Sequence, residues 1–194
     1  MKLKHQKGMF ILILLMASFA PLQAGESGRI HTVTSLGFDP VSRYGSLVAG
    51  TGISLYQEVY IGMGKVIQAG VGLGTLFSRE IPEEGSLSWQ PVYGSVKFFI
   101  PQSEVPFYLK GCAGYAFVQG NNAFMTGKTD LRGGLYTVLG GGVDMPFYYG
   151  NTVRFSFIFD MGYTSYSGEV KQGERETGIS YNTMNVAAGL GMRF

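Results

Sequence analysis

The amino-acid sequence predicts an all-β protein, an eight-stranded antiparallel up-and-down transmembrane β-barrel. Three observations support this fold class. Apolar residues recur at every second position along most of the chain, which is the period of a β-strand with one apolar face. The composition is rich in residues that suit curved strands, with 30 Gly, 14 Phe and 12 Tyr among 194 residues. Short turns and longer polar connections alternate between the repeats.

The first three predicted strands cover residues 29–38, 45–56 and 65–77. The first has the weakest pattern because threonines interrupt its apolar face. In each strand the alternate residues are small or polar, which leaves one apolar face per strand. These apolar faces consist of Ile30, Leu36 and Phe38; of Leu47, Ala49, Ile53 and Leu55; and of Ile67, Ala69, Val71, Leu73 and Phe77.

The next three predicted strands cover residues 92–100, 107–118 and 135–147. Each again has an apolar face and an opposite face of Gly, Ser, Tyr and charged residues. The apolar faces consist of Val92, Val96, Phe98 and Ile100; of Phe107, Leu109, Ala113, Tyr115 and Phe117; and of Leu135, Leu139, Val143, Met145 and Phe147.

The last two predicted strands, 152–164 and 181–194, have the strongest pattern. A transmembrane barrel strand needs about 9–11 residues, and both segments exceed that length. Arg154 and Asp160 lie on the face opposite the apolar row of the first segment. The apolar rows are Val153, Phe155, Phe157, Phe159, Met161 and Tyr163, followed by Met184, Val186, Ala188, Leu190, Met192 and Phe194.

The connections predict which ends of the strands meet. Tight turns are expected at 102–105 and 148–150 and a third turn at 57–64, with Asp39 and Pro40 in a short loop at the opposite end. Longer polar loops are expected at 79–88, 119–132 and 168–180. Short turns at one end and long loops at the other match the periplasmic and extracellular ends of bacterial barrels.

The N-terminal segment predicts export. Lys2, Lys4 and Lys7 precede an apolar run at 9–19, and Leu22-Gln23-Ala24 provides a small residue at a cleavage site. The apolar run is too short for a spanning helix, which takes about 20 residues. We therefore expect a cleaved signal peptide at 1–24 and one barrel domain at 25–194. Cleavage removes three lysines from 15 Lys+Arg and leaves 12 against 13 Asp+Glu, so a nucleic-acid surface is not expected.

The whole expected mature chain resembles the small eight-stranded outer-membrane barrels, the group that contains the transmembrane domain of outer-membrane protein A and the opacity-type proteins. The resemblance rests on the signal segment, the strand number, the loop alternation and the C-terminal strand. It implies a location in the outer membrane of a Gram-negative bacterium. It also implies that the last strand is a terminal signal for the barrel-assembly machinery, carried by Val186, Ala188, Leu190, Met192 and Phe194.

Outward apolar rows place six charged residues inside the barrel, because lipid would penalise them by about 2–4 kcal/mol each near the midplane. We expect Asp144 to lie opposite Arg154, and an acid from another strand to approach the neighbouring Lys97 and Lys110. An eight-stranded barrel is only wide enough to be filled by side chains, so a plugged interior is expected. The predicted structural ion-pair network is Lys97, Lys110, Asp144, Arg154, Asp160 and Arg193.

No catalytic, cofactor-binding or metal-binding set is visible in the sequence. The single cysteine, Cys112, faces inward by parity, and His31 is the only histidine beyond the expected signal. No Ser or acid stands at a recognisable spacing from His31. We therefore expect a protein that is not an enzyme and has no cofactor.

The expected function is structural or interactive. The expected partners are outer-membrane lipid and lipopolysaccharide, the assembly machinery and an unidentified extracellular ligand of the loops, for a monomer that binds no nucleic acid. Three alternatives remain open: a membrane-embedded lipid-modifying enzyme that uses His31, a narrow channel, and a secreted soluble barrel that binds a ligand inside.

Overall fold

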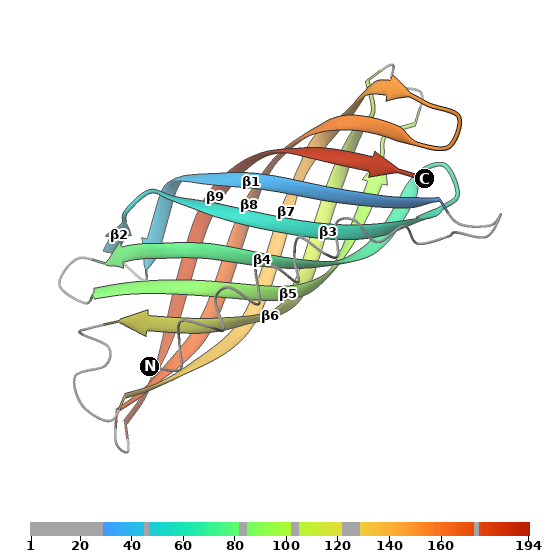
Figure 1. Ribbon diagram of the computed structural model, residues 1–194. Helices are drawn as coiled ribbons and strands as arrows, with labels where there is room; N and C mark the ends of the chain where they lie inside the picture. The colour runs from blue at the N-terminus through green and yellow to red at the C-terminus, as the bar shows by residue number, and fades with distance from the viewer. Residues whose placement is uncertain (1–28, 45–46, 82–84, 102–104, 122–128, 173–174) are drawn as a thin grey trace, which may run out of the picture.

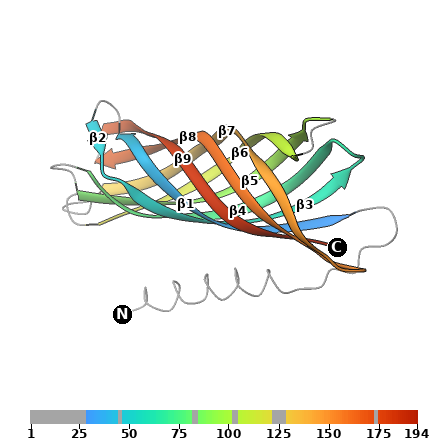
Figure 2. The same ribbon diagram turned by 90° about the horizontal axis from the view of Figure 1, so that it is seen from above.

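The computed structural model describes residues 29–44, 47–81, 85–101, 105–121, 129–172 and 175–194, and these form an antiparallel barrel (Figures 1 and 2). The predicted signal segment, 1–24, lies outside the described residues. Among the described residues, no helix is long and apolar enough to cross a membrane. The strands are β1 Ile30–Tyr44, β2 Leu47–Ala49, β3 Gly52–Met63, β4 Ile67–Ile81, β5 Gly85–Phe99, β6 Phe107–Asn121, β7 Thr129–Tyr149, β8 Arg154–Gln172 and β9 Arg175–Arg193.

The nine β-segments make eight barrel strands. Segments β2 and β3 both pair with β1 in one continuous register, with Ser42 opposite Ala49 and Asp39 opposite Gly52. They are therefore two pieces of one interrupted strand. Pairing of β1 with β9, from His31 opposite Arg193 onward, closes the sheet. The predicted eight-stranded antiparallel barrel is confirmed.

The prediction of an outer loop at Asp39 and Pro40 is wrong, because β1 continues through both residues. The β1–β9 register shifts between Phe38 and Val41, which marks a β-bulge. A bulge tolerates proline because the extra residue need not donate a ladder hydrogen bond. Asp39 is fully buried and accepts a hydrogen bond from Asn185 Nδ2 at 2.7 Å, so an interior contact holds the bulge in the strand.

The prediction of a turn at 57–64 is also wrong. Strand β3 runs to Met63, and the turn occupies 64–66, with Gly64 at a φ of 78° that favours glycine. The predicted turn included Glu58. In the fold it points into the barrel.

The turns at 64–66 and 150–153 and the end of β9 lie at one end of the barrel, here named the turn end. At the opposite end, the loop end, the strands are longer than predicted. Strands β4 to β9 extend into the segments 79–88, 119–132 and 168–180 that were expected to be loops. What remains of those loops, 82–84, 122–128 and 173–174, lies outside the described residues, as does most of the predicted turn at 102–105.

Strands β7, β8 and β9 extend furthest at the loop end. Residues 129–133 of β7 pair with β8 and not with β6, whose pairing with β7 ends at Ala116 opposite Gly134. Among the described residues, 175–180 of β9 likewise pair only with β8, and the described β1 ladder ends at Tyr44 opposite Tyr181. A three-stranded sheet therefore projects beyond the closed part of the barrel.

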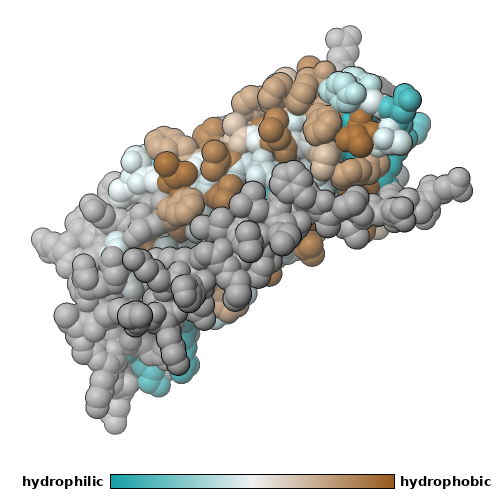
Figure 3. Space-filling model, viewed as in Figure 1, coloured by the Kyte–Doolittle hydropathy of each residue, from teal (hydrophilic) through white to brown (hydrophobic). Residues whose placement is uncertain are grey.

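The apolar rows face outward as predicted. The exposed large apolar side chains follow alternate positions on every long strand, for example Leu139 at 75 % exposure and Val71 at 66 %. Figure 3 shows part of this apolar surface along the visible side of the barrel. The neighbouring positions point inward and are buried, such as Tyr136 and Tyr93.

Three glycines of β4 leave space for tyrosine rings from the adjacent strands. A Cβ on Gly70 would lie 2.7 Å from the ring of Tyr60, and one on Gly72 would lie 2.5 Å from the ring of Tyr93. On Gly74 it would lie 2.8 Å from Tyr56. The repeated glycine of β4 is thus a packing feature that lets large rings fill a narrow interior.

Gly114 of β6 provides a test of this packing. A Cβ there would lie 2.1 Å from the carbonyl oxygen of Val92, whereas one on Gly111 of the same strand would meet nothing within 4 Å. We expect Gly114→Ala to destabilise the barrel by about 1–3 kcal/mol through overpacking against backbone. Gly111→Ala, its matched control, should change stability little. Denaturant unfolding in detergent micelles measures both, and equal shifts would contradict the packing argument.

Candidate functional site: the barrel interior

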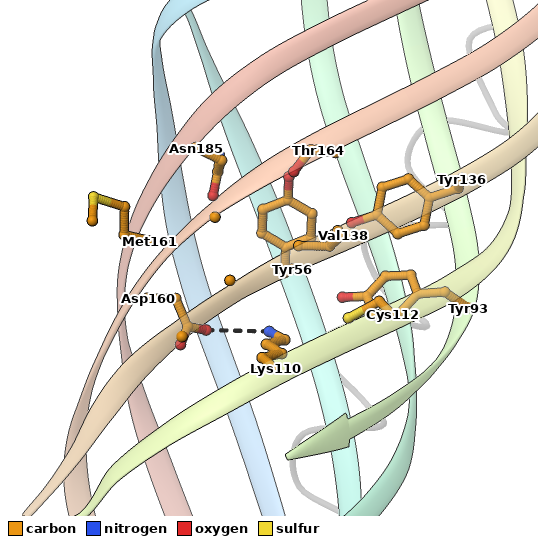
Figure 4. A pocket seen from close by; sticks show the side chains of 13 residues that line it. Tyr56, Tyr93, Lys110, Cys112, Tyr136, Val138, Asp160, Met161, Thr164 and Asn185 are labelled. Atoms are coloured by element: carbon orange, nitrogen blue, oxygen red, sulfur yellow. Dashed lines mark hydrogen bonds and ion pairs between the residues drawn. The ribbon is translucent and has the colours of Figure 1, made fainter. Parts of the chain in front are cut away.

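A cross-barrel ion-pair cluster occupies the middle of the interior. Lys110 Nζ of β6 lies 2.8 Å from Glu58 Oε1 of β3 and 3.1 Å from Asp160 Oδ2 of β8. The Glu58 side chain is fully buried, and those of Lys110 and Asp160 are each 12 % exposed. Because these strands are not neighbours, the cluster links three separate parts of the wall (Figure 4 shows the Lys110–Asp160 contact).

Tyrosine hydroxyls complete this cluster. Tyr93 donates a hydrogen bond to Glu58 Oε1 at 2.9 Å, and the Tyr108 hydroxyl donates to Asp160 Oδ1. Each carboxylate therefore has both a cationic and a neutral donor. Buried charges are tolerated when they are paired and hydrogen-bonded in this way.

Lys97 lies beside this cluster, directly opposite Lys110 in the β5–β6 ladder. Its side chain is fully buried, and its Nζ lies 4.3 Å from the ring centroid of Tyr60 and 4.6 Å from that of Tyr108. Two aromatic faces thus stabilise the ammonium group by cation–π interaction. An acid from other strands does approach the lysine pair, as the sequence predicted, but it contacts Lys110.

A second ion pair lies toward the turn end. Arg193 Nη2 donates to Asp144 Oδ2 at 2.6 Å, and His31 Nδ1 lies 3.9 Å from the same oxygen. The pairing of Asp144 with Arg154 predicted from the sequence is wrong, because Asp144 lies opposite Ile158 and Arg154 lies opposite Tyr149. The connection at 150–153 and a bulge between Pro146 and Tyr148 set this register. Strand alternation predicts which face a residue lies on, but it does not predict which residues of two strands lie opposite each other.

Arg154 lies apart from the carboxylates. Its guanidinium carbon is 4.4 Å from the ring centroid of Tyr149, and in the β8–β9 ladder it lies opposite Arg193. The structure therefore brings five of the six predicted network residues into two clusters or beside them. The sixth, Arg154, stacks on an aromatic ring at the turn end.

An aromatic layer fills the interior toward the loop end. Trp89 stacks on Tyr181 with ring centroids 4.6 Å apart, and Tyr136 lies 4.9 Å from Tyr166 and 5.0 Å from Tyr93. Trp89 was not predicted to lie inside the barrel, because its strand was predicted to begin at residue 92. Apolar and polar residues do alternate from 86 to 90, which was the available signal for a longer strand, but apolar Leu87 and Trp89 fall on the inward parity and not on the outward apolar row.

A small cavity lies between the ion-pair cluster and the aromatic layer. It has a volume of about 30 Å³, and Figure 4 shows tyrosine rings, Lys110 and Asp160 around it. This volume is far below the roughly 300 Å³ of a small-molecule site. Its labelled lining residues are Tyr56, Tyr93, Lys110, Cys112, Tyr136, Val138, Asp160, Met161, Thr164 and Asn185.

Three residues near the turn end have the identities of a hydrolytic triad. Asp144 lies near His31 Nδ1, while His31 Nε2 and Ser156 Oγ lie 2.5 and 2.7 Å from the same point, where a Cβ on Gly191 would be. No spacing in the sequence predicts that these residues lie together. The geometry is nevertheless poor for catalysis: the 3.9 Å Asp144–His31 separation exceeds a hydrogen bond, and Arg193 holds the shared carboxylate oxygen. Among the described residues, no cluster of His, Cys, Asp and Glu could hold a metal ion.

Comparisons with known proteins identify the fold. No family model matches the chain, and no curated protein matches it. Outer membrane protein AlkL, studied in lipid bilayers, is 12 % identical with a TM-score of 0.53, over 90 % of this chain and 95 % of that one. Outer membrane protein OprG from Pseudomonas aeruginosa is 11 % identical with a TM-score of 0.53, over 87 % and 96 %.

Neisserial surface protein A is 13 % identical with a TM-score of 0.52, over 89 % of this chain and 100 % of that one. The chain thus shares its fold with small outer-membrane β-barrels. The narrower resemblance to the outer-membrane protein A and opacity group stays a prediction.

The ion-pair cluster predicts an asymmetric response to mutation. Lys110→Met leaves two largely buried carboxylates without their cation and should destabilise the barrel by about 3–5 kcal/mol. Adding Glu58→Gln and Asp160→Asn should recover part of that loss, because the two carboxylates that lost their cation are then neutral, while Lys97 keeps its contacts with the rings of Tyr60 and Tyr108. Arg154→Met, the control, should cost less than about 1 kcal/mol, since it removes only a ring contact. Unfolding in micelles tests this, and additive losses in the triple variant would contradict it.

Proposed function

We propose that this protein is a monomeric outer-membrane β-barrel with a sealed interior, and that its function is structural or interactive. The observation that carries this proposal is the filled interior. The interior contains an ionic layer toward the turn end and an aromatic layer toward the loop end. The ionic layer consists of Glu58, Lys97, Lys110, Asp144, Asp160 and Arg193. The aromatic layer consists of Trp89, Tyr93, Tyr136, Tyr166 and Tyr181. The cavity between them is too small to pass solutes.

Several features support a location in the outer membrane of a Gram-negative bacterium. The outer surface of the closed barrel is apolar, which suits lipid contact, whereas a soluble barrel would place these rows inside. The predicted signal peptide agrees with export. The shared fold with AlkL and OprG, both outer membrane proteins, adds support. Lipid, lipopolysaccharide and the assembly machinery, acting through the last strand, are the proposed partners.

The loop end is the proposed interaction surface. Strands β7, β8 and β9 project there as a three-stranded sheet on a rigid barrel, which suits binding by loops held on a fixed scaffold. Catalysis is not part of the proposal. The residues Ser156, His31 and Asp144 are 3 %, 1 % and 2 % exposed, so a substrate would have little access to them.

Conductance measurements test the seal. Protein reconstituted into a planar bilayer should give no sustained current above that of the bare membrane, because the two interior layers block ions. Insertion is verified by heat-modifiable gel migration of the same sample. Stable currents that scale with salt concentration would instead favour a channel.

A charge on the outer surface tests the lipid contact. Leu139→Arg, on a residue 75 % exposed near the middle of β7, should lower stability in lipid vesicles by about 2–4 kcal/mol. Asn151→Arg, in the exposed turn before β8, should have little effect. If both variants assembled equally well, or the protein fractionated without detergent, the outer-membrane location would be wrong.

A further inference from the structure

Four buried polar atoms of the turn-end half of the interior lack a hydrogen-bond partner within the part of the chain that the structure describes. They are His31 Nε2, Lys97 Nζ, Asp144 Oδ1 and Arg193 Nε. An unsatisfied buried polar atom costs about 1–3 kcal/mol, and more when the group is charged. Four such atoms in one region therefore point to an occupant that hydrogen-bonds to them.

The four atoms belong to one connected cluster. Arg193 contacts Asp144 at 2.6 Å, and Asp144 lies 3.9 Å from His31. The ring of Tyr60 lies between His31 and Lys97, because its centroid is 6.3 Å from the centroid of the His31 ring and 4.3 Å from Lys97 Nζ. Lys97 in turn lies opposite Lys110, which lines the cavity.

The hydrogen-bonding character of these atoms identifies the occupant. His31 Nδ1 faces Gln68 Oε1 at 3.3 Å and Asp144 Oδ2, both acceptors, so in the neutral imidazole Nδ1 carries the proton and Nε2 accepts. Asp144 Oδ1 also accepts, whereas Lys97 Nζ and Arg193 Nε donate. The cluster therefore presents two acceptors and two donors. An anion would satisfy only the donors and a cation only the acceptors, but water satisfies both.

The charges agree with a neutral occupant. Lys97, Lys110 and Arg193 balance Glu58, Asp144 and Asp160, so the ionic layer needs no further ion. The adjoining cavity has polar groups on its wall, among them those of Lys110, Asp160 and Asn185, and its volume is about 30 Å³, whereas a buried water requires roughly 10–15 Å³ measured in this way. There is thus room for about two water molecules beside Lys110 and Asp160.

We propose that an ordered water network occupies the ionic layer, from the turn-end cluster to the cavity, and stops at the aromatic layer. In the aromatic layer, Trp89 Nε1 also lacks a partner among the described residues. This group is neutral and packed between the rings of Tyr166 and Tyr181, where the cost of leaving it dry is smaller. The interior is thus divided into a hydrated half toward the turn end and a dry half toward the loop end.

The chain contains a reporter in each half. Trp89 is its single tryptophan, and His31 is one of two histidines, the other being His5. In a His5→Gln protein refolded in detergent micelles, water-to-protein NOE spectra measure contacts of water with the carbon-bound ring protons of each reporter. We expect cross-peaks from long-lived water at the His31 ring and none at the Trp89 ring. A His31 ring without water contacts in a folded sample would overturn the proposal.

Two lysine variants test whether the water cross-peaks at the His31 ring come from the cluster of His31, Lys97, Asp144 and Arg193. Lys97→Met removes one of the two donors and should reduce the His31 water cross-peaks at least twofold. Lys65→Met, at the exposed turn after β3, should leave them unchanged. Unchanged cross-peaks in Lys97→Met would overturn the assignment of Lys97 to the network, and exchange of chloride for acetate should not alter them if the occupant is water.

The water network and the sealed interior of the proposed function are separate claims, and the two measurements distinguish them. Water at His31 with no membrane conductance supports both. A dry His31 in a non-conducting barrel overturns the water network and leaves the sealed interior intact. Water at both rings together with sustained conductance defeats the seal, and it also overturns the division into a hydrated and a dry half.

Discussion

The structure depends on one constraint: a barrel of eight strands encloses only enough space for its own inward side chains. Every charge placed inside must therefore find its partner inside. Lys110 meets this constraint by contacting carboxylates from β3 and β8, which are not its neighbours in the sheet. Wall closure and interior charge pairing are consequently coupled, because Glu58 and Asp160 approach Lys110 only when the sheet is closed.

The sequence predicted the division between the two faces well, because strand alternation is a local property. The inward position of Lys97, Cys112 and Asp160 followed from parity alone. Register did not, since it is set by bulges and turn lengths that a parity count does not detect. The bulge after Phe38 kept Asp39 in β1, and the bulge after Pro146 separated Asp144 from Arg154.

The interior partners were the least predictable part of the site. Glu58 reads as a turn residue until Lys110, 52 positions away in the chain, is known to lie across the barrel. The same holds for the Asp144, His31 and Arg193 cluster, which joins both ends of the described chain. Solved barrels of the same fold are only 11–13 % identical to this chain, so the fold does not specify which interior residues meet.

The three glycines of β4 have a consequence for how the chain assembles. Between Gln68 and Leu76 this strand contributes no inward side chain, and the space beside it is filled by tyrosines of β3 and β5. Neither hairpin alone can fill this space. The β3–β4 hairpin supplies only Tyr56 and Tyr60, and the β4–β5 hairpin supplies only Tyr93. The β3–β4–β5 meander should thus form as one cooperative folding unit, with β4 as the surface on which its two neighbours meet.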